Sequence, residues 1–202
     1  MTSLPTAEIS TSQKRIAIFA SGAGSNAKRI IEHFALHPFI KVELVVCNKP
    51  DAGVVNIAAV SNLPVMLIEK EKFFRGDGYL SELGRAGIDF IVLAGFLWKI
   101  PQSLIDAYRN RIINIHPALL PKYGGKGMYG AKVHEAVLAA GEKESGITIH
   151  YVDEHYDNGD VILHVKCEVL THDTTNDLSE RIHKLEHEHY PTVIEKCLDV
   201  IA

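Results

Sequence analysis

Apolar residues in the first half of the chain gather in short runs, separated by stretches with helical periodicity. The runs have the length and β-branched content of buried strands, and they lie at residues 15–20, 42–47, 64–68, 89–94 and 111–115. Helices are predicted between them, at residues 27–34, 54–60, 73–87 and 101–108. Strands that alternate with helices form a mostly parallel sheet with helices on both faces. The run at 89–94 is the most apolar, so we expect it in the middle of the sheet.

The pattern changes after Pro121. Residues 122–130 contain four glycines and predict a flexible, mildly basic loop, followed by a helix at 132–140. Residues 146–152 alternate as a strand buried on one face does, and with 161–169 they extend the sheet as a hairpin-like pair. A last helix is expected from about residue 176 to 201, capped by Thr174 or Thr175 and interrupted near Pro191.

These elements predict one α/β domain, with a mostly parallel twisted sheet and an antiparallel extension near the C-terminus. No repeat, linker or compositional break divides the chain. Residues 1–13 are polar and rich in Ser and Thr, without the apolar core of a signal peptide. We therefore expect residues 1–13 to be a disordered lead-in and residues 14–202 to form the domain.

Composition narrows the class of protein. Hydrophobic residues make up 47% of the 202 residues, as in a globular protein with a full core. The net charge of -4 argues against broad nucleic-acid affinity. The three widely spaced cysteines form neither a disulfide framework nor a CxxC metal pair, so we expect a reducing, cytoplasmic location. The longest uncharged apolar run, residues 90–98, is too short to span a membrane.

Two polar side chains stand at the end of a predicted buried strand. Asn114 and His116 are two residues apart, so in a strand they point to the same face. Pro117 and Pro121 then stiffen the loop that follows. In α/β sheets, ligands bind beyond such strand ends. A capping Asn beside a solvated His explains the same residues equally well.

A glycine-rich turn joins the first strand to the first helix. Residues 21–26 read Ser-Gly-Ala-Gly-Ser-Asn, so the backbone can approach a ligand closely and the helix start offers free amides. The spacing is neither the dinucleotide fingerprint nor a nucleotide-triphosphate loop, which favours a single phosphate. A tight turn without a ligand is the alternative. The rule for strand ends places residues 22–26, 95–100 and 114–116 on one rim.

The turn at residues 153–160 is unusually rich in acids. Asp157 is its strongest candidate, because Gly159 lets the loop fold tightly toward the rim. A carboxylate beside His116 would favour the imidazolium, which could donate with Asn114 to an oxyanion. Asp157 could also relay a proton, although an Asx-turn role accounts for it too.

Other candidates have plain structural explanations. His183 and His187 are four residues apart on the last helix, but the zinc motif HExxH and a third ligand cluster are missing. A solvated helix face is favoured, with Glu186 turned toward a substrate as an alternative. Arg75 is a solvated charge that could reach a ligand carboxylate. The apolar residues 96–98 wall a pocket or belong to the core.

Several motifs together resemble the phosphoribosylglycinamide formyltransferases, the folate-dependent enzymes of purine synthesis. The resemblance covers residues 16–191. It rests on Ser-Gly-x-Gly-Ser-Asn at 21–26, Leu-Ala-Gly-Phe at 93–96, Asn-Ile-His-Pro-x-Leu-Leu-Pro-Lys-Tyr at 114–123, the turn with Asp157, and Glu186-His187 followed by Tyr190-Pro191. The Asn-x-His-Pro core is shared by several formyltransferases and a formyl-folate hydrolase, whereas the 24–26 turn and the Glu186 helix are more specific.

The resemblance implies a Rossmann-like formyltransferase fold and a set of site residues. The catalytic residues would be Asn114, His116 and Asp157. The ribose phosphate would bind to Gly24, Ser25 and Asn26, and the glycinamide end to Glu186 with His183, Lys184 and Leu185. The folate 10-formyltetrahydrofolate would bind, largely through backbone, at Asn114, along Leu97, Trp98, Lys99 and Ile100, and along Asp153, Glu154, His155, Tyr156 and Asp157, with Arg75 nearby.

The implied chemistry is direct transfer of the formyl group to the glycinamide amine, without a metal or a covalent intermediate. The resemblance fits a cytoplasmic monomer or homodimer without nucleic-acid or membrane partners. The chain departs from the family in its long, glycine-rich 122–130 loop. It also has Trp98 and Lys99 where many relatives carry an Arg after Gly-Phe-Met, and Arg75 is one position away from the usual ligand-contacting Arg.

Other functions fit the sequence less well. A formyltetrahydrofolate hydrolase usually carries an N-terminal regulatory domain, for which 13 residues leave no room. A formyltransferase acting on aminoacyl-tRNA would need a further C-terminal domain, and a sugar formyltransferase gives no reason for the 24–26 turn. A non-catalytic phosphometabolite-binding module predicts that Asn114→Ala and His116→Ala leave ligand binding intact and that no turnover occurs.

Overall fold

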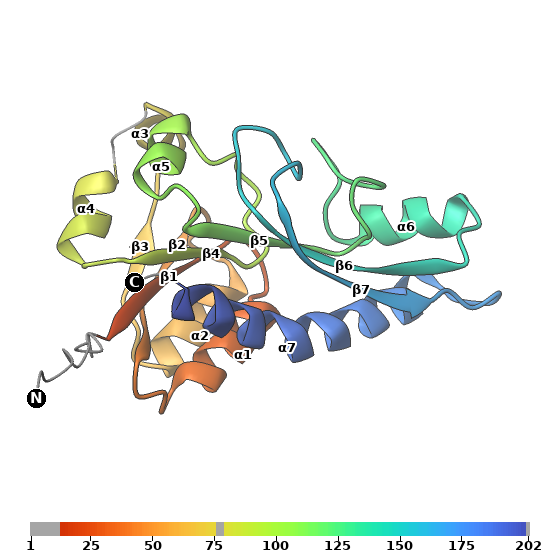
Figure 1. Cartoon of the computed structure of the whole chain (residues 1–202), viewed down its shortest axis with the longest axis horizontal. Coiled ribbons are helices and arrows are strands. Elements are labelled where there is room, and N and C mark those ends of the chain that lie inside the picture. Colours follow the sequence, from red (N-terminus) through yellow and green to blue (C-terminus); the bar gives the residue numbers. More distant parts are fainter. Residues whose placement is uncertain (1–12, 76–78, 201–202) are drawn as a thin grey trace, which may run out of the picture.

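A single seven-stranded sheet runs through the molecule, in the order β3-β2-β1-β4-β5-β6-β7 (Figure 1). The computed structural model describes residues 13–75 and 79–200. The pairs from β3 to β5 are parallel, and β6 and β7 add antiparallel. The strands are β1 (Lys14–Ala20), β2 (Ile40–Cys47), β3 (Val65–Leu67), β4 (Phe90–Leu93), β5 (Ile112–His116), β6 (Glu144–Tyr151) and β7 (Val161–Glu168). The predicted α/β fold with an antiparallel extension is confirmed.

Helices cover both faces of the sheet. Side chains alternate between the two faces along each strand, so apolar residues of one strand pack against both layers of helices. In β1, Ile16 and Ile18 pack with α1 (Ser25–Phe34), α2 (Gly53–Val60) and α7 (Thr175–Asp199). Ala17 and Phe19 pack with α3 (Lys70–Phe74), α4 (Leu80–Arg85) and α5 (Gln102–Ala107) on the other face. The central strand β4 is buried along its whole length, as expected. Helix α6 (Ala131–Ala139) lies beside α7 at the antiparallel end (Figure 1).

Three predictions about elements are wrong. The helix expected at residues 73–87 is split into α3 and α4. The interruption expected near Pro191 is absent, because Tyr190, Pro191 and Ile194 are buried against the core and packing offsets the lost hydrogen bond. Strand β6 is buried on both faces and not on one as predicted, because the loop after β5 packs against it. In that contact the Thr148 hydroxyl accepts a hydrogen bond from the Leu120 amide and donates one to the Ala118 carbonyl.

The start of α7 follows the predicted capping chemistry. Thr174 is the N-cap: its Oγ1 accepts from the Asp177 amide at 3.2 Å, and the Asp177 carboxylate accepts from the Thr174 amide at 2.8 Å. This reciprocal pair is a capping box. Most of the expected N-terminal lead-in, residues 1–12, lies outside the described residues.

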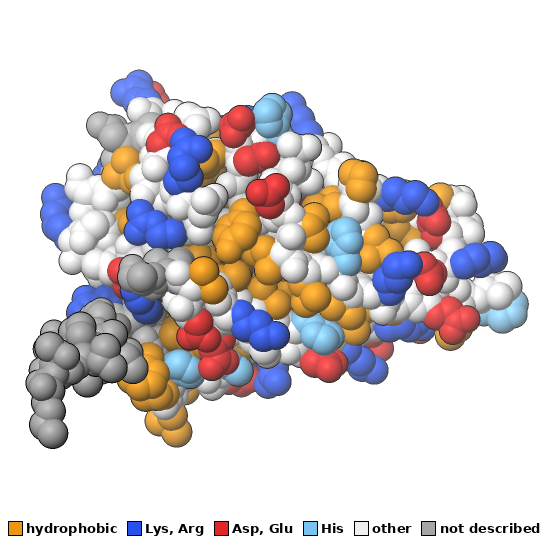
Figure 2. Space-filling model, in the orientation of Figure 1, with side chains coloured by type: hydrophobic (Ala, Val, Ile, Leu, Met, Phe, Trp, Pro, Cys, Tyr) orange, Lys and Arg blue, Asp and Glu red, His pale blue; other side chains and the backbone are white. Residues whose placement is uncertain are grey.

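The surface carries charges of both signs. Figure 2 shows hydrophobic side chains gathered across the middle of one face, around the edge strand β7, with charged side chains around them. β7 has one sheet neighbour and its side chains alternate between exposed and partly buried. Among the described residues, no helix has the length and apolar character needed to cross a membrane.

Candidate active site

A cavity of about 660 Å³ opens where β1, β4 and β5 end. The three predicted rim segments contribute residues 22–26, 94–97 and 114–117 to its wall. Ser21 joins two of these segments, because its amide donates to the Gly95 carbonyl and its Oγ accepts from the Leu97 amide. The remaining wall comes from residues 125–131, His134, Tyr156, Asp157, Ser179, His183 and Glu186. The carboxyl-end rule therefore located the cavity correctly.

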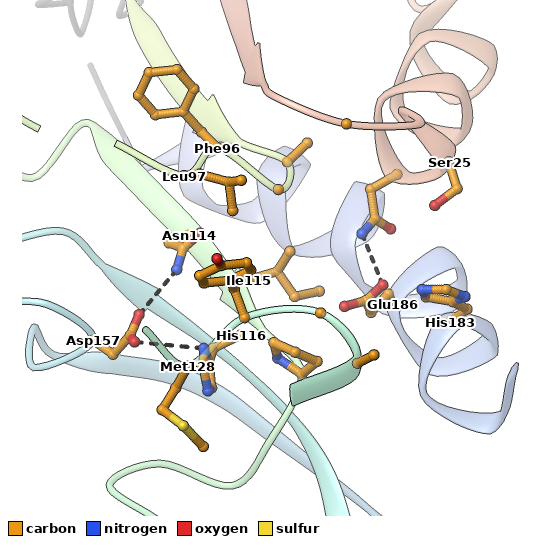
Figure 3. A pocket seen from close by; sticks show the side chains of 18 of the residues that line it. Ser25, Phe96, Leu97, Asn114, Ile115, His116, Met128, Asp157, His183 and Glu186 are labelled. Atoms are coloured by element: carbon orange, nitrogen blue, oxygen red, sulfur yellow. Dashed lines mark hydrogen bonds and ion pairs between the residues drawn. The ribbon is translucent and has the colours of Figure 1, made fainter. Parts of the chain in front are cut away.

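The structure brings the three predicted catalytic residues together (Figure 3). The Asn114 Nδ2 donates to Asp157 Oδ1 at 3.4 Å, and His116 Nδ1 lies 3.6 Å from Asp157 Oδ2. Asn114 and His116 share one face of β5, whereas Asp157 comes from the turn between β6 and β7. The His116 side chain is 4% exposed and that of Asp157 11%, so water screens their interaction weakly.

The His116 ring is fixed by a backbone carbonyl. Its Nε2 lies 2.8 Å from the Tyr123 oxygen, which can only accept, so Nε2 carries a hydrogen and Nδ1 faces Asp157. Burial lowers the pKa of His116, and Asp157 raises it by a smaller amount. The net pKa lies below the ordinary value, so the ring favours the neutral form more than the sequence led us to expect. Proton transfer at Nδ1 is therefore available near neutral pH.

Asp157 stays ionised despite its burial. Burial alone would raise the pKa of its carboxyl. The neighbouring His150 and His116 rings and the Gly125 amide together outweigh burial and lower the pKa. The Gly125 amide donates to Asp157 Oδ2 at 2.8 Å. Asp157 is thus a carboxylate that can accept a proton or hold a cation beside it.

His150 is a buried neighbour of this group that the sequence did not reveal. It pairs with Asn114 in the register of β5 and β6. Its Nδ1 donates to the Tyr151 carbonyl at 2.8 Å, so its Nε2 accepts from the Asn114 amide at 3.2 Å. His150 thereby orients the Asn114 amide. Only the strand register identifies it, and periodicity alone does not give that register.

The glycine-rich turn has the geometry of an anion site. Gly24 has φ +83°, and a Cβ there would lie 2.8 Å from the Val54 Cβ, so glycine is required. Helix α1 begins at Ser25 without a side-chain cap, which leaves its first amides free. Ser25 and Asn26 line the cavity beside them. The positions predicted for phosphate binding therefore lie together at the cavity wall.

Glu186 faces the same end of the cavity from α7 (Figure 3). It is 5% exposed, and its carboxylate accepts from the Asn26 amide at 2.9 Å. Burial raises the pKa of Glu186 to about 7. His183 lies one helical turn earlier and also lines the cavity. Lys184 is exposed and Leu185 packs on the core, because a helix does not present four consecutive residues to one side.

Only some of the residues predicted to bind the folate line the cavity. Leu97, Asn114, Tyr156 and Asp157 line the cavity. The centroid of the half-buried Trp98 ring lies 5.7 Å from those of both Phe73 and Phe74, in an aromatic cluster at the edge of the core. The others are outside the lining: Ile100 is buried in the core, Arg75 pairs with Glu71, and Lys99, Asp153, Glu154 and His155 are on exposed or half-buried loops.

No metal was predicted, and the turn after β6 contains one cluster of residue types that can bind a cation. Possible ligand atoms of Asp153, Glu154 and His155 lie within 4.8 Å of one another on this partly exposed turn. Within residues 13–75 and 79–200, it is the one group of three such residues. The His183 and His187 rings stack, with centroids 6.2 Å apart, and are not part of it.

Comparison with known proteins agrees with this geometry. A family model described as formyl transferase matches residues 14–194. The chain is 42% identical over 188 residues to the chloroplastic phosphoribosylglycinamide formyltransferase of Arabidopsis thaliana, covering 90% of this chain and 64% of that protein. It is 37% identical to the phosphoribosylglycinamide formyltransferase of Bacillus subtilis, covering 92% and 95%.

Solved structures match over nearly the whole chain. The crystal structure of glycinamide ribonucleotide transformylase 1 from Geobacillus kaustophilus is 37% identical, with a TM-score of 0.83, and the match covers 92% of this chain and 99% of that one. The chain spans 64% of the Arabidopsis thaliana protein and 62% of the chloroplastic phosphoribosylglycinamide formyltransferase of Vigna unguiculata, less than two thirds of each. The matched residues include both ends of the cavity and the trio between them, and the chain belongs to the formyl transferase family.

Proposed function

We propose that the protein transfers the formyl group of 10-formyltetrahydrofolate to the amine of phosphoribosylglycinamide. The observation that carries the proposal is the placement of Asn114, His116 and Asp157 between the phosphate turn and the apolar loop that begins at Leu97. An amine held at one end and a formyl donor at the other would meet at these three residues. Relatives named for this reaction have the same fold.

Transfer begins when the amine attacks the formyl carbon and forms a tetrahedral intermediate with an oxyanion. Asn114 supplies one hydrogen-bond donor, because its 3.4 Å bond to Asp157 is the longer of its two and is the easier to exchange. His116 supplies the other donor once its Nδ1 takes a proton. Stabilising charge that develops in the transition state lowers the barrier.

A proton must move from the amine to the folate nitrogen that leaves. Asp157 accepts this proton or holds it on His116 Nδ1, 3.6 Å away. The intermediate then breaks its bond to the folate nitrogen, which takes the proton, and the formyl group remains on the amine. Every step uses groups of the two substrates and the trio, so the reaction requires no metal and no covalent enzyme intermediate.

Each substrate has a place in the cavity. Gly24, Ser25 and Asn26 bind the phosphate through backbone amides and side chains, while Glu186 and His183 meet the remainder of the ribonucleotide. The folate lies along Leu97 and Tyr156, largely against backbone. One relative in Drosophila melanogaster is named a trifunctional purine biosynthetic protein, which supports a place in purine synthesis. The free thiols of Cys47, Cys167 and Cys197 favour a reducing compartment such as the cytoplasm.

Loss of the formyl group from 10-formyltetrahydrofolate tests the proposal, with and without phosphoribosylglycinamide. We expect release that depends on the amine substrate. His116→Ala should lower turnover by about 10²–10³-fold, the effect of removing one such donor, whereas the exposed His172→Ala should retain wild-type turnover. Equal release without the amine would instead identify a formyltetrahydrofolate hydrolase. Ligand binding without any turnover would identify a binding module.

A further inference from the structure

His134 is a buried polar residue of the cavity that the mechanism leaves unused. It lies on α6, is 2% exposed and lines the cavity wall. The ring nitrogens of His116 and His150 have protein partners. The Nδ1 of His134 is enclosed and has no hydrogen-bond partner among the described residues.

An unpaired buried nitrogen is unfavourable, and it persists where another group makes use of the side chain. The neighbouring core positions on α6, Val133 and Val137, are apolar. An apolar residue would fill position 134 without the penalty of an orphaned polar atom. Packing therefore does not account for a histidine at this position, whereas contact with a ligand in the cavity does.

Burial also fixes which ring nitrogen carries the hydrogen. An enclosed N–H without an acceptor is rarer in proteins than an enclosed acceptor without a donor. Nδ1 of His134 therefore holds a lone pair, and the hydrogen lies on Nε2. Because the residue lines the cavity, Nε2–H is the donor available to a bound molecule.

The surroundings of His134 identify the kind of atom that it meets. Burial first, and then the charges of His183 and His116, lower the pKa of His134 to about 4. The ring is thus neutral at physiological pH and suits an uncharged oxygen better than a phosphate. These two neighbours, His116 and His183, place it between the candidate transfer centre and the α7 end of the cavity with Glu186.

We propose that His134 is a further specificity residue, which donates a hydrogen bond from Nε2 to an uncharged oxygen of the ribonucleotide substrate. That oxygen is a ribose hydroxyl or the glycinamide carbonyl. The inference rests on the proposed function, because it concerns the same substrate in the same cavity. It assigns a role to a residue of α6, whereas the substrate residues expected from the sequence lie on the first turn and on α7.

A matched pair of variants isolates the hydrogen bond. His134→Gln keeps a donor near the Nε2 position, and His134→Met has nearly the same shape without one. The KM for phosphoribosylglycinamide should rise roughly three- to tenfold in His134→Met relative to His134→Gln, the usual effect of one neutral hydrogen bond. The KM for 10-formyltetrahydrofolate should be the same in both. Thermal unfolding shows whether each variant is folded.

Inhibition by ribose 5-phosphate separates the two oxygens. A parallel rise in its inhibition constant in His134→Met assigns the contact to a ribose hydroxyl, and an unchanged constant assigns it to the carbonyl. Equal KM values for the ribonucleotide in both variants, or an equal rise for both substrates, would overturn the inference alone. A wild-type protein without amine-dependent transfer would overturn the proposed function, and this inference with it.

Discussion

Glu186 shows how a single buried residue couples this cavity to pH. Its pKa of about 7 in the folded protein lies above the ordinary value of 4.5. Between those two values the folded protein keeps a proton that the unfolded chain has released. The stability linked to Glu186 is therefore fully present below pH 4.5 and is lost as pH rises through about 7.

Glu186→Gln should remove this dependence, because glutamine stays neutral and can still accept from the Asn26 amide. From pH 4.5 to 8, wild type should lose roughly 3 kcal/mol more of its unfolding free energy than the variant does, as expected from the size of the pKa shift. Urea denaturation at a series of pH values measures both. Glu188→Gln, on the exposed side of α7, should keep the wild-type slope. Equal slopes for wild type and Glu186→Gln would contradict the prediction.

The sequence located residues whose chemistry follows from local spacing. Asn114 and His116 are two positions apart in a strand, and Asp157 lies in a tight acidic turn. His150 and His134 were missed because their roles depend on residues far away in the chain. His150 contacts Asn114 through the pairing of β5 with β6, and His134 reaches the cavity only once the chain is folded. Lys184 and Leu185, predicted together with His183 and Glu186, do not line the cavity, since helix periodicity lets the outer two face it together but turns the two residues between them away.

At the scale of elements, the glycine-rich loop at residues 122–130 positions the proposed catalytic residues His116 and Asp157 through its backbone. The Tyr123 carbonyl accepts from His116, and the Gly125 amide donates to Asp157. The Tyr123 hydroxyl donates to Glu142 at 3.0 Å, which anchors the loop to the turn between α6 and β6. Composition predicted a mobile loop. These contacts depend on tertiary packing, so the sequence did not indicate them.

Gly124→Ala should disturb this arrangement without removing any hydrogen-bonding group. A Cβ at Gly124 would lie 2.5 Å from Leu120 Cδ2 and 3.3 Å from the Asp157 Cβ. If Asp157 shifts, turnover should fall by about ten- to a hundredfold, because small displacements of catalytic groups are costly. Gly84→Ala meets nothing within 4 Å in α4 and should keep full turnover. Steady-state kinetics compares them, and unchanged turnover in Gly124→Ala would show that the loop does not position Asp157.

At the scale of the whole molecule, alternating strands and helices predicted the parallel sheet and its cavity edge. The sequence did not predict the hydrogen bonds that hold the last helix against that sheet. Tyr190 of α7 is fully buried, and its hydroxyl donates to the carbonyls of Leu93 and Ile113, at 2.9 and 3.3 Å. These carbonyls belong to the neighbouring strands β4 and β5. Residues almost a hundred positions apart thus meet, which no local pattern encodes.

Tyr190→Phe should therefore weaken the fold as a whole. The ring remains, but two buried carbonyls lose their donor, so the free energy of unfolding should fall by about 1–3 kcal/mol. Tyr129→Phe is a matched control: Tyr129 is 45% exposed, and its loss of a hydroxyl should change stability by less than about 0.5 kcal/mol. Urea denaturation should show a lower midpoint for Tyr190→Phe with an unchanged slope, because α7 and the sheet unfold together. A changed slope would mean that α7 separates from the sheet before the rest unfolds.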